Sequence, residues 1–182
     1  MPKYVAFLRA INVGGHTVKM EHLRSLFETL GFSNVETFIA SGNVIFNSTA
    51  VNTKTLEKNI ETHLLEQLGY QVATFLRSTS ELAAIARHKP FSDVELSTEG
   101  HTLYVGFLRE APSEEARQVV LSKTTPVDDF SFHERELYWL LRTRFSESQF
   151  KGNLEKTLEM QLTLRNATTV RKIAAKYGGD HL

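Results

Sequence analysis

The first apolar segment of the chain contains a basic residue near its end and is followed by a loop with two glycines. Arg9 lies in the segment 4–11, and Asn12, Gly14 and Gly15 come directly after it, ahead of a helical pattern. Backbone N–H groups of a glycine-rich loop before a helix can bind a phosphate or carboxylate group, and a nearby cation adds attraction. The loop lacks the third glycine of a dinucleotide fingerprint and the Lys-Ser/Thr pair of a P-loop. It therefore suits either a small anionic ligand or an ordinary strand–turn–helix connection in which Arg9 pairs structurally.

A second polar segment, Ser41, Gly42 and Asn43, separates the short apolar runs 37–40 and 44–46. The spacing G-x-S-x-G is absent and a strand follows, so the segment does not fit the nucleophile of an α/β-hydrolase. Gly and Asn both tolerate positive φ, which favours a hairpin turn. We expect these residues to border an anion site if the turn lies beside the Gly14–Gly15 loop.

Arg165 and Asn166 precede the last predicted helix and are a third candidate, because an arginine beside a helix N-terminus can bind an anion. A solvated helix face is the alternative explanation for the basic residues of this segment. The seven histidines show no metal-binding spacing, so no metal is predicted. No catalytic residue and no cofactor motif is identified, and the sequence leaves open whether the protein is an enzyme.

Charge and composition limit the classes of partner. Lys and Arg together number 21, as do Asp and Glu, so the net charge is zero and nothing general attracts nucleic acid. The chain has no cysteine, which excludes disulfides and thiol chemistry. No apolar run approaches the ~20 residues that cross a bilayer, and no signal peptide is apparent. We expect a cytoplasmic protein that binds neither nucleic acid nor membrane; the composition does not indicate an oligomeric state.

Hydrophobic periodicity predicts the elements that must position these residues. The segment 4–11 is apolar on both alternating faces, as in a strand buried on both sides. The first half reads as strand 4–11, helix 19–30, strands 37–40 and 44–46, helix 53–68, strand 70–76 and a short helix to residue 87. The second half reads as strand 102–108, helix 112–122, strands 127–132 and 136–141, a helix from residue 146, strand 162–165 and helix 168–177.

The order strand–helix–strand–strand–helix–strand thus occurs twice and is typical of the ferredoxin-like fold. We predict an α+β protein made of two ferredoxin-like (split βαβ, alpha-beta plait) halves packed together. The predicted bounds are 1–90 and 101–182, with 91–100 as the connection. On this interpretation the second half repeats the first in element order, though not in residues.

Three segments together are distinctive: residues 9–15 (RAINVGG), 41–46 (SGNVIF) and 165–170 (RNATTV). In this order and spacing they resemble the bacterial family known as domain of unknown function 1697, over nearly the whole chain. The resemblance implies two ferredoxin-like halves and a cytoplasmic bacterial setting, and it implies no activity. The chain departs from the family pattern at Ala10, where glycine is usual, at Ala167, where tryptophan is usual, and at Gln149, where lysine follows Ser148.

Two functional hypotheses follow from these residues. In the leading one, a small anionic or phosphate-bearing ligand binds where the Asn12–Gly15 loop meets the Ser41–Asn43 turn, with Arg9, Arg165 and Asn166 contributing. In the alternative, the same residues serve turns and intramolecular pairing in a structural or protein-interaction module with no small-molecule site.

Overall fold

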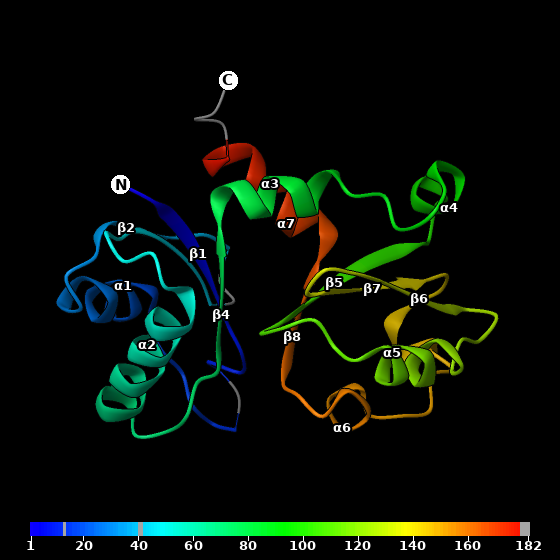
Figure 1. The fold of residues 1–182 in the computed structure, drawn as a ribbon, viewed down its shortest axis with the longest axis horizontal. Helices are drawn as coiled ribbons and strands as arrows, with labels where there is room; N and C mark the ends of the chain where they lie inside the picture. The colour runs from blue at the N-terminus through cyan, green and yellow to red at the C-terminus, as the bar shows by residue number, and fades with distance from the viewer. Residues whose placement is uncertain (13, 40–41, 179–182) are drawn as a thin grey trace. The chain divides into compact units, whose positions relative to one another are not determined.

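The computed structural model describes residues 1–12, 14–39 and 42–178 (Figure 1). The chain divides into two compact units. The first comprises Met1–Ala84 together with Ile173–Leu182, and the second comprises Ile85–Lys172. Each unit contains its own four-stranded antiparallel sheet. Among the described residues, no helix is long and apolar enough to cross a bilayer.

The first unit has the ferredoxin-like order of elements. Its strands and helices are β1 (Lys3–Leu8), α1 (Met20–Thr29), β2 (Ser33–Thr37), β3 (Asn43–Asn47), α2 (Thr53–Leu68) and β4 (Thr74–Ser78), followed by α3 (Thr79–Arg87), which continues into the second unit. The strands lie in the order β2-β3-β1-β4, and every neighbouring pair is antiparallel. This is the split βαβ arrangement that the sequence predicts.

Apolar periodicity accounts for the core of this unit. Leu23 and Phe27 of α1, and Ile60 and Leu64 of α2, are fully buried against one face of the sheet. The other face is also apolar and buried, at Val5, Phe7, Ile45 and Phe75. The prediction that the first strand is buried on both faces is therefore confirmed.

The second unit repeats the order of the first. It contains α4 (Asp93–Ser97), β5 (Thr102–Leu108), α5 (Glu114–Leu121), β6 (Asp128–His133), β7 (Glu136–Leu141), a 3₁₀ helix (Phe145–Glu147), α6 (Leu154–Leu158), β8 (Leu162–Asn166) and α7 (Ala167–Tyr177), whose last turns belong to the first unit. The strands lie in the order β6-β7-β5-β8, the counterpart of the first sheet. The predicted fold of two ferredoxin-like α+β halves is confirmed.

The repeat extends to residues, so the expectation that only the element order repeats is wrong. Residues 4–9 read YVAFLR and residues 104–109 read YVGFLR. The two segments also pair alike, because Val5 lies opposite Arg77 in one sheet and Val105 lies opposite Arg165 in the other. The structures of the two units can therefore be compared residue by residue along the central strand.

Several predicted elements differ from the structure. The first strand ends at Leu8 instead of residue 11, and the fourth lies at Thr74–Ser78 instead of 70–76. The second strand lies at Ser33–Thr37 instead of 37–40, because Val35 is the residue that this edge strand buries. The predicted helix from Ser146 does not form. Asp128 holds Ser148 and the backbone of Gln149 instead, through hydrogen bonds of 2.6 and 2.9 Å, and the helix begins only at Leu154.

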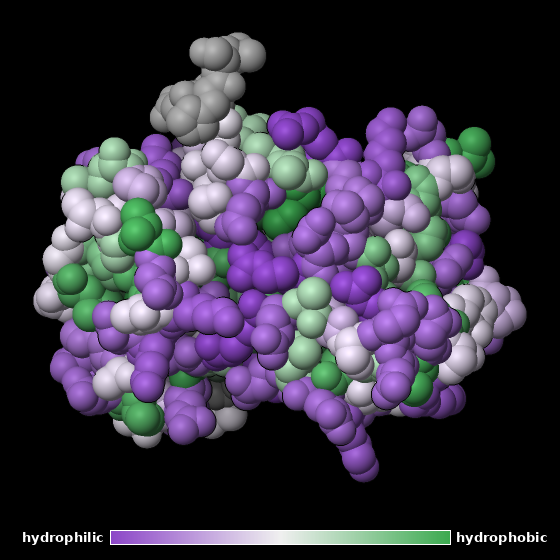
Figure 2. Space-filling model, in the orientation of Figure 1, coloured by the Kyte–Doolittle hydropathy of each residue, from purple (hydrophilic) through white to green (hydrophobic). Residues whose placement is uncertain are grey.

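Large apolar side chains at the surface come from separate positions along the chain. On the face shown in Figure 2, the apolar (green) areas are small and lie among polar (purple) ones. The exposed large apolar residues are Met1, Ile39, Val51, Leu65, Val94, Val119 and Phe145. Phe145 differs from the rest because it contacts other rings, those of Tyr104 and Trp139.

Candidate functional site

The connection between β1 and α1, residues 9–19, is called the glycine loop below; Val13 lies outside the described residues. Hydrogen bonds of the described residues hold its backbone. The Arg9 N–H donates to the carbonyl of Ala73 (2.9 Å), and the Val18 N–H donates to Oδ1 of Asn12 (2.8 Å). The Tyr70 hydroxyl donates to the carbonyl of Ile11 (2.9 Å). The loop is thereby fixed at both ends while its middle is exposed.

Tyr70 is a residue of this site that the sequence did not single out. It follows the left-handed Gly69 that ends α2, and burial raises the pKa of its hydroxyl, which keeps the group a donor. The His16 ring stacks on the Tyr70 ring with centroids 3.9 Å apart. In the sequence, the only sign of a special role for Tyr70 is its place directly after a glycine that ends a helix. No sequence pattern predicts that Tyr70 contacts His16.

The backbone of the glycine loop turns through left-handed conformations. Gly14 and Gly15 have φ angles of 63° and 81°, which glycine adopts without a Cβ penalty. Ala10 has a φ of 56°, so the position where the resembled family usually has glycine also requires this conformation. A Cβ on Gly15 would meet nothing within 4 Å, so open space adjoins this part of the loop.

Unpaired backbone donors gather at the end of the glycine loop. Helix α1 begins after Lys19, which supplies no side-chain cap. Within the described part of the chain, the N–H groups of Gly14, Gly15 and His16 also donate no hydrogen bond. Exposed donors of this kind, together with the partial positive charge of a helix N-terminus, favour an anion.

The second unit shows what the same connection needs for folding alone. There, β5 and α5 are joined by residues 109–113, a segment less than half as long as the glycine loop. Ser113 caps α5 by accepting a hydrogen bond from the Ala116 N–H (3.2 Å). The extra length, the glycine pair and the missing cap of the first unit are therefore not requirements of the fold.

The structure places part of the second polar segment directly beside the glycine loop. The Leu8 N–H donates to the carbonyl of Gly42 (2.8 Å), and a Cβ on Gly42 would lie 3.0 Å from Leu8 Cβ and from Ile11 Cγ2. Asn43 is buried and its Nδ2 donates to the carbonyl of Phe38 (3.1 Å), so its amide closes the turn. Ser41 lies outside the described residues. Gly42 thus packs against Leu8 and Ile11 at the start of the loop, and Asn43 closes the turn that contains Gly42.

Arg165 and Asn166 belong to the second unit, whereas the glycine loop and the Gly42–Asn43 turn belong to the first. Nη1 of Arg165 donates to Thr163 Oγ1 (2.8 Å) and to the carbonyl of Leu164 (3.1 Å), and burial lowers the pKa of the guanidinium to about 10. Oδ1 of Asn166 accepts from the Thr168 N–H (2.9 Å) and so caps the start of α7. These contacts give both residues structural partners in their own unit.

No group of three His, Cys, Asp or Glu side chains that could hold a metal ion occurs in the described ranges 1–12, 14–39 and 42–178. The glycine loop accordingly offers backbone donors and basic side chains, at His16 and Lys19, and no cluster of carboxylates.

The fold defines a class of small α+β proteins built from two ferredoxin-like halves, each with its own sheet. The chain belongs to the family described as protein of unknown function (DUF1697), whose family model matches residues 1–138. The earlier resemblance is therefore confirmed. The match covers all of the glycine loop and the Gly42–Asn43 turn.

A solved structure with a similar fold is that of a conserved bacterial protein from Streptococcus pneumoniae. It aligns with a TM-score of 0.75 and 22% sequence identity over 96% of this chain and 97% of that chain. At this identity the likeness concerns the fold alone. No curated protein matches the chain.

Proposed function

We propose that the protein binds a small anionic or phosphate-bearing ligand at the glycine loop. The observation that carries the proposal is the contrast between the two units. The first unit joins β1 to the uncapped α1 through an exposed Gly14–Gly15 pair, whereas the second unit makes the same connection with a short, capped segment. A loop that exceeds the needs of the fold and presents free N–H groups is suited to an anion.

The surrounding side chains support the same ligand class. Lys19 is exposed at the start of α1, His16 lies against Tyr70, and Arg9 stands at the end of β1. A cation near a helix N-terminus strengthens anion binding by adding charge to the backbone donors. The loop is also held in place before any ligand arrives, by Asn12 and Tyr70, so little ordering cost is added on binding.

Isothermal titration with inorganic phosphate, pyrophosphate and a nucleoside monophosphate tests the proposal. The informative variant is Lys19→Ser, because a serine at this position caps α1 with its own hydroxyl and removes the charge. We expect it to raise the denaturation midpoint and to abolish binding of the anion that the wild type binds. Lys54→Ser, at an exposed lysine of α2, is the control and should bind normally. The proposal fails if no anion binds the wild type or if Lys19→Ser binds equally well.

The alternative function is a structural or protein-interaction module. It is favoured by Asn12 and Asn43, whose side chains both serve intramolecular hydrogen bonds instead of facing outward. It predicts that substitutions of Gly14 or Gly42 lower stability while every anion response stays at the wild-type level. Thermal-shift measurements on these variants, with and without pyrophosphate, separate the two functions.

The setting we propose is the bacterial cytoplasm, in line with the absence of cysteine and with the bacterial origin of the similar structure. We also propose that the protein does not bind nucleic acid, because its net charge is zero. Retention on DNA or RNA that falls with salt would contradict this. The domain bounds 1–90 and 101–182 stay a prediction.

A further inference from the structure

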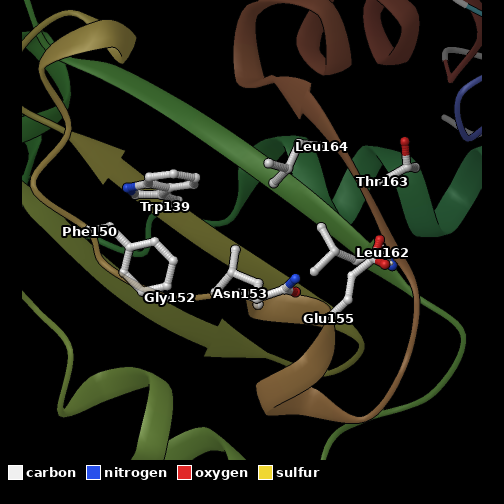
Figure 3. A pocket seen from close by; sticks show the side chains of 9 residues that line it. Trp139, Phe150, Gly152, Asn153, Glu155, Leu162, Thr163 and Leu164 are labelled. Atoms are coloured by element: carbon white, nitrogen blue, oxygen red, sulfur yellow. Dashed lines mark hydrogen bonds between the residues drawn. The ribbon is translucent and has the colours of Figure 1, made fainter. Parts of the chain in front are cut away.

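A pocket of about 340 Å³ opens in the second unit, on the sheet face that also carries α5 and α6 (Figure 3). It is lined by Trp139, Phe150, Gly152, Asn153, Leu154, Glu155, Leu162, Thr163 and Leu164. Its volume is near the lower end of the range of ligand pockets, about 300–1,000 Å³, so it suits a small compound. The pocket lies in a different unit from the glycine loop and is independent of the function proposed there.

The pocket arises where the two units differ. In the first unit the second crossover helix, α2, has 16 residues and covers the sheet. Its counterpart in the second unit, α6, has five residues and follows an irregular segment that contains Gly152. Apolar side chains of the second sheet, which a helix as long as α2 would cover, therefore line an open space.

The aromatic side of the pocket is held in place. The indole N–H of Trp139 donates to Oδ1 of Asp128 (3.1 Å), and the Phe150 ring meets the Trp139 ring edge-on with centroids 5.8 Å apart. The Phe150 N–H donates to Oγ of Ser148, which itself donates to Asp128. One buried carboxylate thus fixes both rings before any ligand is present.

The polar groups at the two ends of the pocket differ in character. Near Phe150, a Cβ placed on Gly152 would lie 3.2 Å from Nζ of Lys123, and within the described residues this ammonium group makes no ion pair. Asn153 uses its Oδ1 to cap α6, whereas its Nδ2 donates no hydrogen bond in the described part of the chain. Glu155 lies on the far side from Phe150 in Figure 3, and its Oε1 accepts from the Leu162 N–H at 3.4 Å. Lys123 therefore places a positive charge beside Gly152, next to the pocket lining, and Asn153 contributes a donor from within the lining.

We propose that this pocket binds a small aromatic carboxylate. The ring of the ligand lies between the aromatic pair Trp139–Phe150 and the leucines of β8, where it buries apolar area and makes edge-on ring contacts. The carboxylate of the ligand points toward Lys123 and Nδ2 of Asn153. The amphipathic lining, apolar at its base with donors at one end, matches a ligand that is apolar at one end and anionic at the other.

Phenylacetate is the probe, and Trp139 is the reporter because the chain has one tryptophan. We expect a saturable change in Trp139 emission on titration, with the same midpoint by calorimetry. Lys123→Gln should weaken phenylacetate binding by about tenfold or more, the effect of losing a hydrogen bond to a charged group. Lys151→Gln is the control. Neither lysine belongs to the pocket lining, but Nζ of Lys123 lies beside the Cβ position of Gly152, whereas Lys151 is an exposed residue that adjoins Gly152 in the sequence.

Two further arms make the test specific. Gly152→Val should weaken binding, because its Cβ would lie 2.9 Å from Phe150 Cζ and the ring must leave the position in which it lines the pocket. Acetate should fail to compete with phenylacetate, since it lacks the ring. The proposal is overturned if phenylacetate does not saturate, if acetate competes equally, or if the Lys123→Gln and Lys151→Gln proteins, both with wild-type circular dichroism, bind alike.

Discussion

The indole Nε1–H of Trp139 donates a hydrogen bond to Oδ1 of Asp128, and both residues are buried. The same carboxylate accepts three more hydrogen bonds, from the hydroxyls of Thr125 (2.7 Å) and Ser148 (2.6 Å) and from the backbone of Gln149 (2.9 Å). Burial by itself would raise the pKa of Asp128, but these four donors outweigh it and hold the pKa below its usual range. Asp128 therefore ties β6, β7 and the segment before α6 together.

Replacing this acceptor should destabilise the second unit. Asp128→Asn keeps the size of the side chain but offers one acceptor oxygen and two unwanted donors. We expect a loss of about 2–3 kcal/mol in the free energy of unfolding, because buried donors are left without partners. Urea denaturation followed by Trp139 emission measures the loss. The exposed Asp93→Asn should stay within about 0.5 kcal/mol of the wild type, and equal stability of the two variants would contradict the role of Asp128.

The same carboxylate should make stability depend on pH in acid. The pKa of Asp128 is lower in the folded protein than the value of about 3.9 in an unfolded chain. Its stabilising contribution is therefore fully present above about pH 4 and is lost as the pH falls through the folded pKa. Urea midpoints measured between about pH 5 and pH 2.5 should fall with acid, and the fall should be shallower in Asp128→Asn. Parallel profiles would show that other carboxylates dominate.

The glycines near the first strand should differ in their tolerance of alanine. Gly15→Ala adds a Cβ in open space and costs only the left-handed conformation, about 1 kcal/mol. Gly42→Ala carries the same cost and in addition sets a Cβ 3.0 Å from Leu8 and Ile11, which adds about 1–3 kcal/mol of overpacking. Denaturant titrations of both variants give the difference directly. A Gly42→Ala protein as stable as Gly15→Ala would mean that the two segments do not pack together.

Two asparagines of β3 should respond in opposite ways to leucine. Asn47 has a buried Oδ1 with no hydrogen-bond partner in the described structure, so Asn47→Leu removes an unsatisfied acceptor and should stabilise the protein by about 1 kcal/mol. Asn43→Leu instead removes the donor that closes the turn at Phe38 and should destabilise it. The unfolding midpoints of the two variants test both statements. A midpoint that shifts in the same direction in both variants would contradict the different roles given to the two asparagines.

Elements with a strong repeat of apolar residues were predictable. Leucine or isoleucine recurs every four positions along α2, Gly69 follows, and the helix has the predicted bounds, Thr53–Leu68. The bounds of β7, Glu136–Leu141, also match because all of its side chains are buried. The edge strand β2 was placed several residues too late, since it buries only Val35 and carries little periodic signal.

Contacts between residues far apart in the chain could not be predicted from the sequence. The adjacency of Gly42 to the glycine loop depends on the pairing of β1 with β3, and the helix expected from Ser146 is replaced because Asp128, far back in the chain, takes Ser148. The aromatic pocket was missed for a related reason. A glycine such as Gly152 disfavours a helix interior, but only the fold shows which side chains the missing turns leave uncovered.

The last turns of α7 belong to the first unit, where the Tyr177 hydroxyl donates to Oε2 of Glu36 on β2. These residues are synthesised after all the residues of the second unit. The first unit consequently cannot be completed until the second unit has been synthesised, although its sheet strands emerge first. The carboxy-terminal unit, whose residues run continuously from Ile85 to Lys172, has all its parts earlier.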